Sequence, residues 1–75
     1  MADHRFEESA DYVQSLARGL SVLRAFGRDL PTPSLSDLAS HTGLSRAVVR
    51  RSLMTLQHLG YVGQRGRQFF LTPRV

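Results

Sequence analysis

The sequence predicts an α+β fold, mostly helical, in which three helices are followed by a C-terminal two-stranded β-hairpin. Three observations favour this fold. Apolar residues recur at helical spacing in three segments, and each segment opens on a serine, a residue that commonly caps helices. A glycine closes or directly follows each segment, where helices often end. The last apolar stretch is divided by a glycine turn, as in a hairpin.

The chain is short enough to form one domain at most. It has 75 residues and no cysteine, so its core must be small and cannot be reinforced by disulfides. Residues 1–12 are polar and acidic, and we expect them to form a flexible N-terminal segment. Residues 13–75 are expected to form the domain.

The first helix is expected over residues 15–27. Ser15 is the predicted N-cap, and Gly27 fits the position after the last turn. Gly19 weakens the helix interior and can allow a close helix contact. The predicted core stripe of this helix follows i, i+4, i+7 spacing and consists of Leu16, Leu20 and Leu23.

The second helix is expected over residues 34–42, after a loop at 28–33 whose two prolines disfavour helix. Ser34 and Asp37 have the spacing of a capping box, with Asp in place of the usual Glu. Gly43 then ends the helix because glycine readily adopts the left-handed conformation.

The third and longest helix is expected over residues 45–59. Ser45 is its predicted N-cap and Gly60 ends it. Its core stripe consists of Val49, Leu53 and Leu56.

The hairpin is expected over residues 61–72. Arg65-Gly66-Arg67 forms its turn, and Pro73 ends its second strand. Together with the short turn Thr42-Gly43-Leu44, this order of elements predicts a winged helix-turn-helix. The helix-turn-helix covers about 34–54, and the hairpin is the wing.

Charge divides the chain into two unlike halves. The first 37 residues carry four arginines and six acidic residues, whereas the last 38 carry six arginines and no acidic residue. All ten cations of the chain are arginine, which favours bidentate binding of phosphate and guanine, although codon bias in a GC-rich genome is an equally good explanation. A half-chain with unopposed cations indicates a polyanionic partner.

Six residues of the third helix lie off its core stripe near the N-terminus, where a helix of this kind enters the DNA major groove. We expect DNA contacts from Ser45, Arg46, Ala47, Val48, Arg50 and Arg51. Val48, which we expect to be exposed, suits a thymine methyl group. The alternative is that the arginines form an ordinary solvated helix face.

Arg65 and Arg67 at the wing tip are expected to follow the phosphate backbone or enter a narrow minor groove. A solvent-exposed turn is the alternative. Ser34 and Ser45 lie at helix N-termini, where backbone N–H groups attract phosphate, so a phosphate contact is expected there in addition to capping.

The sequence does not support enzyme activity, cofactor binding or insertion into a membrane. The histidines His4, His41 and His58 are far apart and have no nucleophile or carboxylate at motif spacing. Metal-ligand spacing is absent, so we expect no metal, no cofactor and no enzyme activity. No apolar run has the length of a membrane span and no secretory signal precedes the domain, which predicts a cytoplasmic protein.

Five short motifs, in order and at consistent spacing, carry a family resemblance: Ser15-Leu-Ala-Arg-Gly-Leu20, Leu35-Ser-Asp-Leu-Ala39, Thr42-Gly-Leu44, Leu59-Gly-Tyr-Val62 and Phe70-Leu-Thr-Pro73. Over residues 13–75 the chain resembles the N-terminal DNA-binding domain of the IclR family of bacterial transcriptional regulators. The opening Tyr12-Val13-Gln14 with the first motif is most similar to the subgroup that controls aromatic-acid catabolism through the β-ketoadipate pathway.

The resemblance implies partners that composition does not show. Members of this family bind palindromic operators in double-stranded DNA as dimers or tetramers, which implies a dimer interface at Tyr12, Val13 and Leu16. They sense a small-molecule effector through a C-terminal domain, which this chain does not contain. Two other uses of such a fold remain open, namely binding RNA and binding a protein partner. The unopposed arginines argue against the protein partner, whereas RNA presents the same phosphate field.

Overall fold

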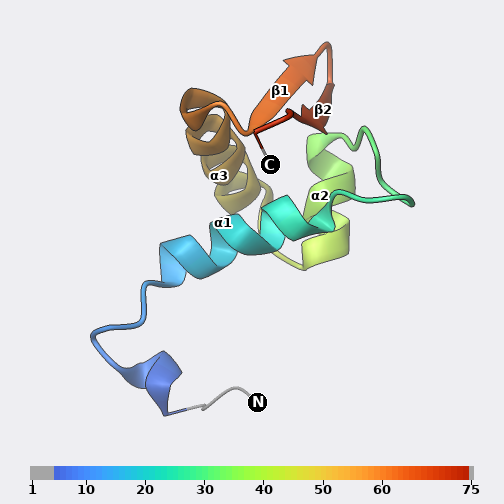
Figure 1. Cartoon of the computed structure of the whole chain (residues 1–75). Coiled ribbons are helices and arrows are strands. Elements are labelled where there is room, and N and C mark those ends of the chain that lie inside the picture. Colours follow the sequence, from blue (N-terminus) through green and yellow to red (C-terminus); the bar gives the residue numbers. More distant parts are fainter. Residues whose placement is uncertain (1–4, 75) are drawn as a thin grey trace.

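The computed structural model describes residues 5–74 and confirms the predicted fold class (Figure 1). Three α-helices precede an antiparallel two-stranded hairpin, and a short 3₁₀ helix, η1, precedes them all. The elements are η1 (Phe6–Glu8), α1 (Gln14–Ala25), α2 (Leu35–Thr42), α3 (Arg46–Leu59), β1 (Val62–Arg65) and β2 (Gln68–Leu71). Within the described residues, no helix is long and apolar enough to cross a membrane.

The segment expected to be flexible, residues 1–12, lies partly outside the described residues, which begin at Arg5. Its described part folds back on itself in η1, where the N–H of Ser9 donates to the carbonyl of Phe6 at 2.9 Å. The rings of Phe6 and Tyr12 meet edge to face, with centroids 6.0 Å apart. This segment lies at the end of the molecule opposite the hairpin (Figure 1).

The predicted bounds of α1 are wrong at both ends. The helix begins at Gln14 with Val13 at the N-cap position, because the N–H of Ala17 already donates to the Val13 carbonyl at 3.1 Å. Ser15 therefore lies inside the first turn and does not cap the helix. At the other end Phe26 leaves the helix in an extended conformation, so Gly27 does not take the left-handed role of a C-terminal glycine.

The predicted core stripe of α1 is also wrong. Leu16 and Leu20 are 60% and 40% exposed, and the buried side of the helix carries Val22 and Ala25, followed by Phe26. Leu16 and Leu20 lie about 170° around the helix axis from Val22 and Ala25, so α1 has apolar residues on two opposite sides. Packing against α2, α3 and the hairpin selects the second set, and only Leu23 of the predicted stripe packs against the core.

The helix-turn-helix itself agrees with the prediction. Ser34 caps α2 in a reciprocal capping box with Asp37, and Ser45 caps α3 by accepting from the N–H of Val48 at 3.2 Å. Gly43 adopts the left-handed conformation with φ of 75°, which only glycine does without strain. The turn between the helices is therefore built from the local chemistry that predicted it.

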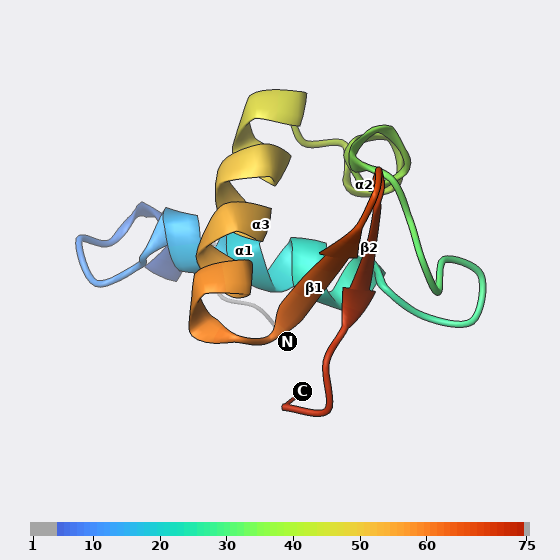
Figure 2. The same ribbon diagram turned by 90° about the horizontal axis from the view of Figure 1, so that it is seen from above.

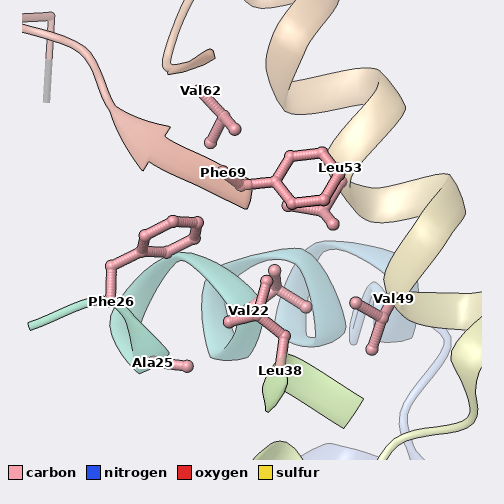
Figure 3. Close-up of a cluster of buried hydrophobic side chains, with 8 residues drawn as sticks. All are labelled: Val22, Ala25, Phe26, Leu38, Val49, Leu53, Val62 and Phe69. Atoms are coloured by element: carbon pink, nitrogen blue, oxygen red, sulfur yellow. The ribbon is translucent and has the colours of Figure 1, made fainter. Parts of the chain in front are cut away.

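The core contains one or two buried side chains from each α-helix and each strand, together with Phe26, which follows α1. Figure 3 shows Phe69 of β2 beside Leu53 of α3, with Val22 and Leu38 meeting from α1 and α2. Val49 and Leu53 of the predicted α3 stripe are buried, and Leu56 packs against the core from its edge. The buried apolar residues are Val22, Ala25, Phe26, Leu38, Val49, Leu53, Val62 and Phe69.

The wing is a tight hairpin. Its strands pair from Val62 opposite Leu71 to Arg65 opposite Gln68, and Gly66 occupies the turn with φ of 62°. Arg65 therefore belongs to β1, whereas we predicted it in the turn. Side chains alternate between the two faces of the hairpin, so Gln64 and Phe69 face α3.

Two anchors hold the wing, and the sequence indicated neither. The N–H of Phe69 donates to the carbonyl of the fully buried Pro33 at 2.9 Å, and Ser34 forms an isolated antiparallel β-bridge with Gln68. The segment just before α2 therefore pairs with the start of β2, and Figure 2 shows the hairpin beside α2. At the other end Thr72 donates its hydroxyl to the carbonyl of Gly60. The wing is thus fastened to the ends of both helices of the helix-turn-helix.

Gly63 should not tolerate a side chain. It pairs with Phe70, whose ring covers the glycine so closely that an added Cβ would overlap three ring atoms, all within 3.0 Å. We expect Gly63→Ala to lower stability by about 1–3 kcal/mol because the ring must move. Gly19→Ala is the matched control, since nothing lies within 4 Å of its added Cβ, and it should gain about 0.5–1 kcal/mol of helix stability. Thermal denaturation of both variants tests this, and equal shifts in Tm would contradict the Phe70 contact.

Candidate nucleic-acid interface

The solvent side of α3 has two flanks and an outer face. At about 100° per residue, Arg46 and Arg50 fall on the flank toward the wing, while Ala47 and Arg51 fall on the outer face. All four are exposed. The three arginines that we predicted to act together thus point in at least two directions.

Arg46 and Arg50 line a groove between α3 and the wing. The groove has a volume of about 700 Å³ and is bounded by the start of α2 at Ser34 and by the wing at Gln64 and Arg67. Three guanidinium groups from two distant segments of the sequence therefore border one open groove. No acidic residue follows Asp37, so none from this half of the chain can oppose them.

Arg51 borders a second groove, which runs between α3 and α1. This groove has a volume of about 590 Å³ and is mainly apolar, with Leu16, Leu20 and Leu59 among its walls. Arg51 stands at its rim and is exposed. It is the arginine of α3 that points furthest from the core.

The expectation that Val48 is exposed is wrong. Its side chain is half-buried and lines the apolar groove with Leu16 and Leu20. A half-buried valine beside leucines has an ordinary packing explanation, so the argument that Val48 needs a thymine methyl group no longer holds. Leu20 sits opposite because α1 presents its second apolar side here.

The two wing arginines lie on different sides of the hairpin. Arg67, in the turn, borders the groove shared with Arg46 and Arg50. Arg65, in β1, lies on the opposite face, where its guanidinium carbon is 5.9 Å from the centroid of the Phe70 ring. The pair that we predicted as one cationic tip is therefore two separate cations.

Ser34 and Ser45 both act as helix caps. The Ser34 hydroxyl accepts from the N–H of Asp37 at 3.1 Å while the Asp37 carboxylate accepts from the N–H of Ser34 at 3.0 Å. Ser34 lines the groove and is half-buried, whereas Ser45 is exposed. Ser34 lines the groove that Arg46 and Arg50 border, and Ser45 directly precedes Arg46 in the sequence.

Two glutamines connect α3 with the wing, and the sequence analysis missed them. The Gln57 amide donates to the Gln64 side-chain oxygen at 3.3 Å, and the Gln64 amide donates to the Gly66 carbonyl at 2.9 Å. Glutamine is too common on helix surfaces for its position alone to have revealed this link. The two bonds join α3 to β1 and β1 to the turn of the wing, and both glutamines line the groove.

The titratable residues are dispersed. His41 and His58 are both exposed, in the last turns of α2 and α3, and His4 lies outside the described residues. Within residues 5–74, no three His, Cys, Asp or Glu side chains gather as metal ligands would.

Comparison with known proteins identifies this arrangement. The IclR helix-turn-helix domain matches residues 15–66. The p-hydroxybenzoate hydroxylase transcriptional activator of Acinetobacter baylyi is 43% identical over 74 residues, covering 96% of this chain and 27% of the activator. The Pca operon regulatory protein of the same organism is 38% identical over 65 residues, covering 87% of this chain and 23% of the regulator.

A solved structure agrees in fold. The crystal structure of a proposed transcriptional regulator from Rhodococcus sp. RHA1 is 56% identical and superposes with a TM-score of 0.81, over 84% of this chain and 25% of that one. The chain thus spans about a quarter of the length of the proteins that it matches. These relatives are regulators of transcription and not enzymes. The winged fold, the helix-turn-helix match and the level of identity show that this chain belongs to the IclR family of transcriptional regulators, whose DNA-binding helix-turn-helix domain it carries.

Proposed function

We propose that this domain binds double-stranded operator DNA in a sequence-specific manner, with α3 in the major groove and the wing at the backbone or minor groove. The observation that carries the proposal is the groove where Arg46, Arg50 and Arg67 meet without an opposing acid. Cations placed around a concave surface concentrate a polyanion there and lose affinity steeply with salt.

In this arrangement the residues of α3 divide their contacts. Arg51 and Ala47 on the outer face enter deepest and meet base edges, and Arg50 reaches guanine or phosphate from the wing side. Arg46 and Arg67 contact the phosphates of the strand that lies between α3 and the wing. Arg65 meets the backbone or minor groove beyond the wing.

The capped helix starts supplement these contacts. The N-terminus of α3 beside Ser45 and that of α2 beside Ser34 present backbone N–H groups and the positive end of a helix dipole. Both starts adjoin the arginine groups and both suit a phosphate oxygen. These contacts would fix the position of the domain on DNA without reading its sequence.

The domain is proposed to act as a homodimer, or a tetramer of two such dimers, on a palindromic operator. Tyr12, Val13 and Leu16 are the expected interface residues, and Val13 and Leu16 are 55% and 60% exposed. Leu16 also lines the apolar groove between α1 and α3. An exposed apolar surface of this kind, at the end of the molecule opposite the wing, is suited to a second subunit.

The relatives also indicate which genes such a regulator controls. Two of them are named for the Pca operon and for p-hydroxybenzoate hydroxylase. By analogy we propose that the whole protein regulates aromatic-acid catabolism and responds to a small-molecule effector outside this domain.

Selection of bound sequences from random duplex DNA tests the proposal. We expect a palindromic consensus, with half-sites about one helical turn apart. A competition in moderate salt between the selected duplex and an RNA duplex of the same sequence separates DNA binding from RNA binding. Enrichment of no sequence, or equal competition by the RNA, would overturn sequence-specific DNA binding.

A further inference from the structure

Phe70 lies on the wing at a position that packing in the core does not explain. Its neighbour Phe69 fills the core, whereas Phe70 lies on the opposite face of the hairpin and is only half-buried. A large aromatic ring on an exposed face of a four-residue strand gains little from burial. Its position therefore needs another explanation.

Gly63 determines where the ring lies. It is the cross-strand partner of Phe70, and the ring covers the space that any side chain at this position would fill. An aromatic ring packed over a cross-strand glycine is held from below by the backbone. The pairing gives Phe70 a defined orientation that an exposed side chain would otherwise lack.

Arg65 lies above the same ring. It shares the face of β1 with Gly63, two residues further along, and its guanidinium carbon is 5.9 Å from the ring centroid. An arginine side chain has many rotamers in solvent. Restricting it to one rotamer on binding costs conformational entropy, which lowers the affinity. A cation over an aromatic face loses part of that freedom before any ligand arrives.

Arg67 provides the contrast within the same hairpin. It lies in the turn, borders the groove of α3 and makes no cation–π contact in the described part of the chain. Of the two wing arginines, only Arg65 therefore lies over an aromatic ring.

We propose that Phe70 is a positioning residue: seated on Gly63, it holds the Arg65 guanidinium in the orientation in which that group contacts DNA. This inference rests on the proposed DNA-binding function. Phe70 acts through Arg65 and does not itself touch the nucleic acid.

A double-mutant cycle tests the inference with the 75-residue chain and a mixed-sequence DNA duplex at low salt, so that no operator is needed. The variants are Phe70→Leu, Arg65→Ala and the combination of both. We expect Phe70→Leu to weaken binding about two- to fivefold, as expected for loss of an exposed cation–π contact. In the Arg65→Ala background the same change should have no effect, because Phe70 acts only through that arginine.

Two controls separate positioning from a general disturbance of the wing. Phe70→Tyr keeps the aromatic face and should bind DNA as the parent does. Thermal denaturation of Phe70→Leu should show a folded domain, and Arg67→Ala/Phe70→Leu should retain the full effect of the leucine. An equal loss from Phe70→Leu with and without Arg65 would overturn the positioning role. Failure of the parent chain itself to bind the duplex would instead overturn the proposed function.

Discussion

Replacing Leu53 with alanine should remove a large part of the stability of this domain. Leu53 is 1% exposed and lies in the core beside Phe69 (Figure 3). Truncating a buried leucine costs about 2–5 kcal/mol. A domain of this length has roughly 4–11 kcal/mol in total, so Tm should fall by roughly 10–40 °C.

Met54→Ala is the matched control for this prediction. Met54 is the next residue of α3 and is 51% exposed, so its truncation leaves the core intact. Far-UV circular dichroism during heating compares the two variants. If Leu53→Ala and Met54→Ala melt at the same temperature, the core arrangement around α3 is wrong.

The double variant Arg50→Ala/Arg51→Ala should lose most of its sequence-specific affinity for DNA. The two side chains leave α3 on the wing flank and on the outer face, so one change cannot compensate for the other. An arginine that reads guanine contributes about 1–3 kcal/mol. If both contributions are independent, the loss is about 2–6 kcal/mol, measured with the selected duplex by fluorescence anisotropy.

Charge must be controlled in this experiment, because removing any two cations weakens attraction to DNA. Arg24→Ala/Arg28→Ala removes the same charge from two exposed positions in the half of the chain that carries the acidic residues. It should reduce affinity far less. Unchanged operator affinity in the Arg50/Arg51 variant would refute the assignment of α3 as the reading helix.

Arg67→Ala should weaken binding to all sequences alike and lower the salt slope by about one, as loss of a phosphate contact does.

Features that depend on residues close together in the sequence are predicted correctly. Ser34, Asp37 and Ser45 were identified as caps because a cap bonds to an N–H only three residues away, and both caps are present. Gly43 and Gly60 were identified as helix ends for the same reason, and both have positive φ. Local bonds of this kind are specified by adjacent residues and survive into the fold.

The wrong predictions concern α1, mainly the question of which of its sides is buried. α1 has two apolar sides, and the helical period cannot say which one is buried because burial depends on what packs against it. The buried side of α1 therefore emerged only with α2, α3 and the hairpin in place, and with it the half-buried position of Val48. Ser15 was assigned as a cap from its residue type, although the helix already starts at Gln14.

The sequence alone determined the order of elements, the capped helix-turn-helix, and the confinement of unopposed arginines to its second half, since these depend on residue type and short spacing. Only the tertiary structure decided how those arginines are distributed. Arg46, Arg50 and Arg67 border one groove, Arg51 points outward, and Arg65 lies over Phe70 on the far side of the wing. Their directions depend on how the wing docks on the helices. The N–H of Phe69 donates to the carbonyl of Pro33, far away in the sequence, and Gln57 of α3 bonds to Gln64 of β1.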